Sequence, residues 1–308
     1  MMDALRGGGR ALADGWFATA PASRLAASRI VHGAWTTGYL LSRRRMFGRV
    51  HRTDTGLFAP VGPCRVLREP LSAAVADRIV DATVVSVAAA AAGIGYRVTG
   101  PVAAAMLTWT LAYRNSWSMV FHNDNLVALH AMALGAGRSA DALSFDALAA
   151  RSVGGPAAAD PGYGWPLQLC SAATASTYFL AGVAKVAGPL GWGWASGDSL
   201  RRQVAVDGIR KELFGTPASL LAYRLYRKEA LFRVLAIGSL SVELLAPLAL
   251  LNRRLGRLWA LAAWQMHWGI LAIMKIKFRY QMSGAAYSSF ADLEHAVAAI
   301  SRWLKGPS

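Results

Sequence analysis

The sequence is poor in cysteine and in acidic residues. Of its 308 residues, 17 are Asp or Glu, 33 are Lys or Arg, and two are Cys. Cys64 and Cys170 are too few for a disulfide framework, and no His or Cys spacing matches a metal-binding motif. We also expect no cleavable signal peptide, because the first residues contain no apolar core of the required length. These absences exclude a disulfide-stapled fold and a motif-based metal site.

Charge of both signs is scarce. Charged residues make up 16% of the chain and hydrophobic residues 55%, whereas a soluble domain usually has about 25% charged residues. The formal net charge of +16 comes mainly from short basic loops between apolar runs, such as "SRRRMFGRVHR" at 42–52 and "YRLYRKEALFR" at 223–233. Basic flanks of membrane helices facing anionic lipid explain this pattern better than nucleic-acid binding. We therefore expect membrane lipid, and no nucleic acid, as a partner.

Long apolar runs dominate the chain. A membrane-spanning helix needs about 20 apolar residues, and the tail has the pattern of an interfacial helix or a last short span. The runs cover residues 25–41, 79–96, 101–120, 121–136, 166–187, 230–251 and 258–274, and the tail covers 290–304. The sequence predicts an all-α fold: one domain over residues 1–308, a polytopic integral membrane bundle of about seven to eight membrane-associated helices in a bacterial-type cell membrane.

Three apolar runs each offer one ionisable group at membrane depth or near it. Lys185 stands near the end of "YFLAGVAKVAG", where a lysine is either a functional group or extends its ammonium toward the membrane surface. Glu243 stands in the middle of a helix, so its carboxyl is expected to be protonated or matched by a cation from another helix. His267 is either a hydrogen-bonded core histidine or a site residue. If the three groups converge, they form a candidate site.

The segment "YRNSWSMVFHNDNLVALH" is unusually polar. His122 and His130 lie two turns apart in a continuous helix and would share one face. Asp124 or Asn123 could orient an imidazole, as carboxylates often do. The alternative is a polar loop between two helices in which Asp124 or Asn125 caps a helix. Spacing alone leaves both interpretations open.

Several motifs together resemble one known family. "YFLAGVAKVAGPLGWGWASGDSLRRQV" is similar to a segment of the vitamin K-dependent γ-glutamyl carboxylases. "YRNSWSMVFHNDNLVAL", "SFDAL", the helix with Glu243 and "MHWGILAIMKIKFRYQMSG" resemble further elements, in the same order, of the horizontally transferred transmembrane (HTTM) domain. The likeness runs from about Arg24 to Gly284 and rests on the order and spacing of short motifs.

The resemblance implies a chemistry for Lys185. It matches the lysine with which the family deprotonates a hydroquinone, so that O₂ can convert it to an epoxide. We expect an enzyme that acts on a prenyl lipid such as an isoprenoid hydroquinone, with reduced quinone and O₂ as co-reactants. The chain has no counterpart of the carboxylases' large luminal part, so carboxylation of a protein substrate is not expected. The candidate catalytic residues are Lys185, His122, Asp124, Glu243 and His267, and the candidate substrate-binding residues are Arg114, Trp117, Tyr178 and Trp194.

Two other functions remain open. A non-canonical membrane terpene cyclase would use the 11 tryptophans to stabilise carbocations and an acid such as Asp124 or Glu243 to start cyclisation. That enzyme would need Mg²⁺ if its substrate were a diphosphate, although the chain has no DDxxD or DxDD motif. The other alternative is a non-enzymatic export or immunity protein of the HTTM type.

Overall fold

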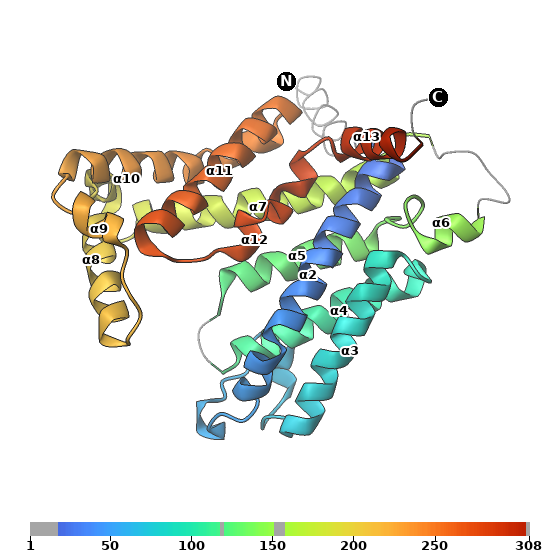
Figure 1. Ribbon diagram of the computed structural model, residues 1–308, viewed down its shortest axis with the longest axis horizontal. Helices are drawn as coiled ribbons and strands as arrows, with labels where there is room; N and C mark the ends of the chain where they lie inside the picture. Colours follow the sequence, from blue (N-terminus) through green and yellow to red (C-terminus); the bar gives the residue numbers. More distant parts are fainter. Residues whose placement is uncertain (1–17, 118–119, 151–157, 306–308) are drawn as a thin grey trace, which may run out of the picture. The chain divides into compact units, whose positions relative to one another are not determined.

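The structure is a computed structural model that describes residues 18–117, 120–150 and 158–305 (Figure 1). Every regular element in these ranges is a helix, and one isolated antiparallel bridge joins Ala20 to Asp160. The described residues fall into two compact units. Unit 1 contains the chain up to Ala173 together with the part from Ala291 onward, and unit 2 is Thr174–Phe290.

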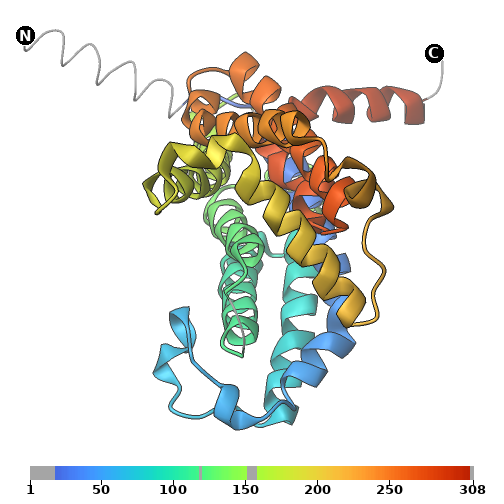
Figure 2. The same ribbon diagram turned by 90° about the vertical axis from the view of Figure 1, so that its left-hand side faces the viewer.

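Unit 1 is built on a row of helices. Helix α2 contacts α3, α3 contacts α4 and α4 contacts α5, and Figures 1 and 2 show these helices, coloured from blue to green, running alongside one another. Helix α13 packs against α2. The elements are α2 (Ala22–Val50), η1 (Thr55–Leu57), η2 (Gly62–Val66), α3 (Ala73–Ala92), α4 (Tyr96–Asn115), α5 (His122–Ala136), α6 (Phe145–Ala150), the first part of α7 (Pro161–Ala187) and α13 (Leu293–Lys305).

The turn between α3 and α4 shows how local chemistry sets the helix ends in unit 1. Gly93, with φ 69°, ends α3 in the left-handed conformation that glycine adopts without steric cost. The carboxylate of Asp146 accepts hydrogen bonds from the backbone N–H groups of Gly95 (2.8 Å) and Tyr96 (2.7 Å). These amides have no partner inside α4, so Asp146 caps the start of that helix. The helix therefore begins at Tyr96, and Pro101 lies inside it, not at its first residue as the run 101–120 suggested.

Unit 2 contains the second part of α7 and the helices that follow it. Asn252 caps α11 by accepting from the N–H groups of Arg254 and Leu255, and Lys275 ends it with φ 52°. One buried apolar cluster consists of Trp194, Ala236 and Leu240. The remaining elements are η3 (Gly191–Ser196), α8 (Asp198–Leu213), α9 (Leu220–Leu225), α10 (Glu229–Leu244), η4 (Ala246–Leu250), α11 (Arg253–Met274), α12 (Arg279–Met282) and η5 (Ala285–Phe290).

The prediction of a polytopic bundle of about seven to eight membrane-associated helices is wrong. Among the described residues, one helix, Pro161–Ala187, is long and apolar enough to cross a membrane. Helices α5 and α10 have 15 and 16 residues, fewer than the roughly 20 that a span needs. Helix α3 carries Asp77, Arg78 and Asp81 near its start. The predicted multi-pass location in a bacterial-type cell membrane, with the HTTM membrane architecture, is corrected for the same reason.

The prediction of a loop over residues 43–52 is also wrong, because helix α2 continues through most of that tract to Val50. Arginine is a good helix former, so a run of arginines does not by itself end a helix. Two of these arginines, Arg44 and Arg52, form ion pairs with acidic residues of α3. The tract is therefore part of the packing between α2 and α3.

Candidate functional site

Lys185 and Glu243 form a close ion pair inside unit 2. The Nζ atom of Lys185, in the last turn of α7, lies 2.5 Å and 2.6 Å from the two carboxylate oxygens of Glu243 on α10. The Glu243 side chain is 9% exposed and the Lys185 side chain 26% exposed. The cation that Glu243 was expected to find on another helix is thus Lys185. The pair is closed on the carboxylate side and partly open on the ammonium side.

Gly182 allows the close approach of α7 to α10. A Cβ atom at this position would lie 2.9 Å from the Cβ of Glu243 and 3.0 Å from a side-chain carbon of Leu244. Real Cβ contacts are longer than this, so any larger residue would push the two helices apart. Gly182 precedes Lys185 by three residues, which places both on the same side of α7. The glycine therefore lets the lysine reach its carboxylate.

Burial and the tryptophan ring shape the electrostatics of the pair. Burial raises the pKa of Glu243, and the hydrogen bond and charge of Lys185 oppose that increase. The Lys185 Nζ atom also lies 5.1 Å from the centre of the Trp194 ring, a cation–π contact. Trp194 belongs to the buried cluster with Ala236 and Leu240, so its ring is held in place. The site stabilises the ammonium on two sides while disfavouring the ionised carboxylate.

A phenol–imidazole group occupies the next part of unit 2. The hydroxyls of Tyr178 and Tyr287 are hydrogen-bonded to each other, and the His267 Nδ1 atom lies 3.3 Å from the Tyr178 hydroxyl. Nδ1 is also 2.8 Å from the carbonyl oxygen of Ala263, which can only accept, so this nitrogen carries the proton. The pKa of Tyr178 is raised, mainly by burial and to a smaller extent by the neighbouring Tyr287 and Glu243. Glu243 and this group therefore influence each other electrostatically.

Unit 2 thus contains five of the residues that the sequence singled out. Tyr178 and Lys185 lie two turns apart on one face of α7, and all but Lys185 are buried. The five residues are Lys185, Glu243, His267, Tyr178 and Trp194. Their functional roles stay predictions.

Arg114 and Asp124 form a separate buried ion pair in unit 1. Arg114 Nη1 donates to Asp124, whose other carboxylate oxygen lies 3.4 Å from the Tyr39 hydroxyl. The guanidinium of Arg114 also lies 4.2 Å from the centre of the Phe121 ring. Burial raises the pKa of Asp124, opposed by Arg114. The described contacts of this carboxylate are therefore with an arginine and a tyrosine. The side chain of His122 lies outside the described residues, so the orientation of an imidazole by Asp124 stays a prediction.

The other predicted residues of unit 1 have simpler surroundings. Trp117 is 7% exposed and belongs to a core cluster with Tyr113, Cys64 and Ala76, so it forms part of the packing. His130 Nε2 lies 3.1 Å from the carbonyl oxygen of Cys170. The side chain of His122 lies outside the described residues, and its role beside Lys185 stays a prediction.

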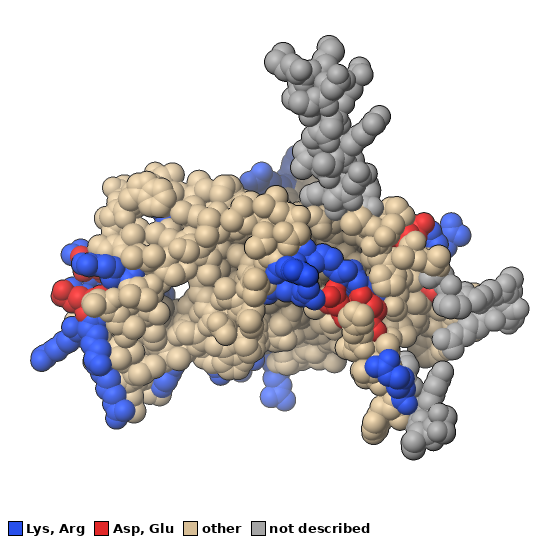
Figure 3. All heavy atoms as spheres, turned by 90° about the horizontal axis from the view of Figure 1, so that it is seen from above, with Lys and Arg blue, Asp and Glu red and all other residues tan. Residues whose placement is uncertain are grey.

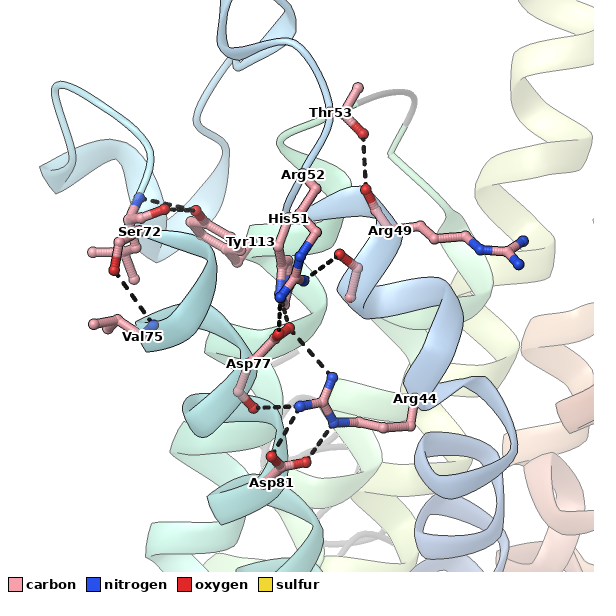
Figure 4. Close-up of polar contacts among 12 residues, drawn as sticks. Arg44, Arg49, His51, Arg52, Thr53, Ser72, Val75, Asp77, Asp81 and Tyr113 are labelled. Atoms are coloured by element: carbon pink, nitrogen blue, oxygen red, sulfur yellow. Dashed lines mark hydrogen bonds and ion pairs between the residues drawn. The ribbon is translucent and has the colours of Figure 1, made fainter.

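A denser ionic cluster ties α2 to α3 (Figure 4). Asp77 accepts from Arg52 (2.8 Å) and His51 (2.8 Å), and Arg44 lies between Asp77 (3.3 Å) and Asp81 (2.9 Å). The pKa of Asp77 is lowered to about 2. The main cause is the hydrogen bond from Arg52, and the hydrogen bond from His51 and the charges of Arg44 and Arg52 add to it. Burial lowers the pKa of His51, so its imidazole is neutral near pH 7. A carboxylate held ionised by two arginines has no proton to exchange, and the cluster is structural.

No described group of three or more His, Cys, Asp or Glu side chains could hold a metal ion. The Mg²⁺ that a diphosphate substrate would require therefore has no ready ligand set in the part of the chain that the structure describes.

Two residues that complete the site were not identified from the sequence. Gly182 looked like one small residue among many in α7, and Tyr287 gave no signal because its partner Tyr178 is 109 residues away. The glycine could have been found by noting that it shares a helix face with Tyr178 and Lys185. The tyrosine pair depends on tertiary packing.

Comparison with family models, with curated proteins and with solved structures found no match to this chain. The resemblance described from its motifs therefore stays a prediction, and the function is argued from the geometry of the site.

Proposed function

We propose that this chain is an enzyme that removes a proton from the hydroxyl group of an apolar substrate, an isoprenoid hydroquinone or a related prenyl lipid. The observation that carries the proposal is the Lys185–Glu243 pair: an ammonium that is partly open to the surroundings, backed by a buried carboxylate with a raised pKa. Lys185 is the base that contacts substrate, and Glu243 receives the proton that the lysine must lose. The motif around Lys185 independently resembles that of hydroquinone-oxygenating enzymes.

The proton moves in two steps. An apolar substrate that covers Lys185 excludes water, and a pair of neutral groups is then favoured over a pair of charges. The ammonium passes one proton to Glu243, which leaves a neutral amine and a carboxylic acid. The amine then takes the hydroxyl proton of the substrate and becomes an ammonium that stabilises the new oxyanion. Overall, one proton has moved from the substrate oxygen to the carboxylate of Glu243.

The deprotonated hydroquinone is the species that reacts with O₂. The hydroquinone and O₂ together give the quinone epoxide and water, so no further oxidant is required. The protein holds the substrate anion beside Lys185, whose charge is also stabilised by the Trp194 ring. Apolar side chains that follow α7 support an apolar substrate, since Leu190 is 58% exposed and Trp192 is 70% exposed. Leu190 and Trp192 follow Lys185, the exposed member of the ion pair, closely in the sequence.

The test is turnover of a defined substrate. Purified protein is incubated with a reduced isoprenoid quinone under air, and products are separated by mass spectrometry. The expected product is a quinone epoxide formed faster than in a control with Lys185→Ala protein. Equal product formation by both proteins, at equal folded content, would overturn the proposal.

The cyclase alternative has no contact that favours it. Both candidate acids are ion-paired, Asp124 with Arg114 and Glu243 with Lys185, whereas a cyclase needs a protonated acid facing its substrate. A cyclic hydrocarbon formed from a prenyl diphosphate would nevertheless replace the proposed function. If the unmodified chain turned over no prenyl substrate, the non-enzymatic alternative would remain.

A further inference from the structure

Helix α8 turns an apolar face away from the fold. Val204 is its buried residue, while Val206, Ile209 and Leu213 are 63%, 60% and 78% exposed. Spacings of three and four residues place these three side chains on one face of the helix. Val204 points to the opposite side, where α8 packs within unit 2. The outward face of α8 therefore exposes three large apolar side chains among polar ones.

Two arginines border that face. Arg202 precedes Val206 by one turn and Arg210 follows Ile209, and both are exposed. They line a groove of about 500 Å³ beside η3. Neither forms an ion pair with a described carboxylate, because the two aspartates of the groove are already engaged, Asp198 with Arg201 and Asp207 with Lys211. The groove therefore presents two arginines outside the described ion pairs, beside the exposed side chain of Val206.

The same composition continues beyond α8. Phe214 and Leu220 are 79% and 72% exposed. From residue 198 to 233 the chain has eight Lys or Arg and four Asp or Glu. Figure 3 shows Lys and Arg side chains projecting at the end where Figure 1 places α8, α9 and α10. Exposed hydrophobic side chains and an excess of basic residues thus continue along this segment.

We infer that the outward face of α8 docks on the surface of a bilayer that contains anionic phospholipid. Arg202 and Arg210 bind headgroup phosphates, and Val206, Ile209 and Leu213 enter the boundary between headgroups and acyl chains. Arginine suits this position because its stem lies along apolar surface while its guanidinium stays with the phosphates. The inference concerns adsorption of one helix face, needs no membrane-crossing helix and does not rest on the proposed function.

Charge decides between a bilayer and a second copy of the chain as the occupant. A symmetric dimer through this face would bring the same patch of both copies together, and Arg202 and Arg210 of one copy would face those of the other. Such like-charge contacts oppose association. An anionic lipid surface covers the apolar side chains and neutralises both arginines at once.

The experiment is co-sedimentation of the full chain with vesicles of phosphatidylcholine, with and without phosphatidylglycerol. We expect binding to the anionic vesicles that weakens as salt is raised. The double variant Arg202→Gln/Arg210→Gln should weaken binding about 30-fold, since each basic residue near an anionic surface adds roughly a factor of five to six. The triple variant Val206→Ser/Ile209→Ser/Leu213→Ser should weaken it by about tenfold or more.

Matched controls keep the test specific. Arg97→Gln/Arg254→Gln removes two exposed arginines outside the α8 segment, and Val85→Ser/Val98→Ser/Leu258→Ser removes apolar side chains that are 68%, 67% and 65% exposed. These controls should bind as the unmodified chain does, and circular dichroism should show equal helix content in all proteins. No binding to anionic vesicles, or equal losses in the α8 and control variants, would overturn the inference. A dimer in lipid-free buffer that the α8 serine variant abolishes would assign the face to a second copy instead.

Discussion

Two ionic clusters of this protein place a carboxylate in opposite electrostatic surroundings. In unit 1, Asp77 is contacted by two arginines and one imidazole, and its pKa falls to about 2. In unit 2, Glu243 is contacted by one lysine, and burial raises its pKa. A carboxylate with several cationic donors is permanently ionised and holds helices together. A buried carboxylate with a single cation has a raised pKa and lies closer to its neutral form.

The largest expected effect tests whether the Lys185–Glu243 pair transfers protons. Lys185→Arg keeps a cation beside Glu243 but cannot release a proton at working pH. We expect a loss of turnover of about 100-fold or more with little change in thermal stability. The measurement is epoxide formation from the hydroquinone together with a melting curve. Full activity in this variant would reduce the pair to a structural contact like that of Asp77.

The next effect concerns stability in unit 1. Asp77→Asn removes the charge that neutralises Arg44 and Arg52, and we expect the free energy of unfolding to fall by about 2 kcal/mol. Denaturant unfolding measures it. The control is Glu69→Gln, an exposed carboxylate with no described ion pair, which should change stability by about 0.5 kcal/mol or less. Equal changes in the two variants would show that the cluster does not tie α2 to α3.

A change of similar size probes the approach of α7 to α10. Gly182→Ala places a methyl group against Glu243 and Leu244, which we expect to cost about 1 to 3 kcal/mol and to lower turnover. Gly238→Ala is the matched control on α10, because a Cβ there meets nothing within 4 Å. That substitution should be neutral or stabilise the helix by up to about 1 kcal/mol. A tolerated Gly182→Ala with full activity would separate helix spacing from the function of the pair.

The smallest effect concerns the pH dependence of stability. As pH rises, the contributions of Asp77 and Glu243 to the free energy of unfolding should change in opposite directions. The folded pKa of Asp77 is depressed, so its stabilisation is complete above its unfolded pKa of about 4 and is lost as pH falls toward about 2. The folded pKa of Glu243 is raised, so its contribution falls as pH rises through and above its ordinary value of 4.5. Unfolding free energies of Asp77→Asn and Glu243→Gln across this range should therefore deviate from the unmodified chain in opposite directions. Deviations of the same sign would contradict the comparison.

The sequence by itself placed the main ionisable groups on helices. Lys185 is in the last turn of α7, Glu243 lies near the end of α10, and His267 lies within α11. Helical periodicity is a local property, so it can be read from neighbouring residues. The same local reading failed where packing decides: the count of apolar runs predicted membrane spans, and the arginines of 43–52 suggested a loop.

Tertiary structure alone decided which groups meet. The partners are far apart in sequence. Lys185 and Glu243 are separated by 58 residues, Tyr178 and Tyr287 by 109 residues, and Arg44 and Asp81 by 37 residues. A single lysine, tyrosine or arginine has the same chemistry wherever it stands in the chain. Its pKa and its task depend on burial and on partners that other helices bring within a few ångströms. Local sequence therefore determined the helices and the available groups, while the fold determined which cations meet each carboxylate and whether its pKa is lowered, as for Asp77, or raised, as for Glu243.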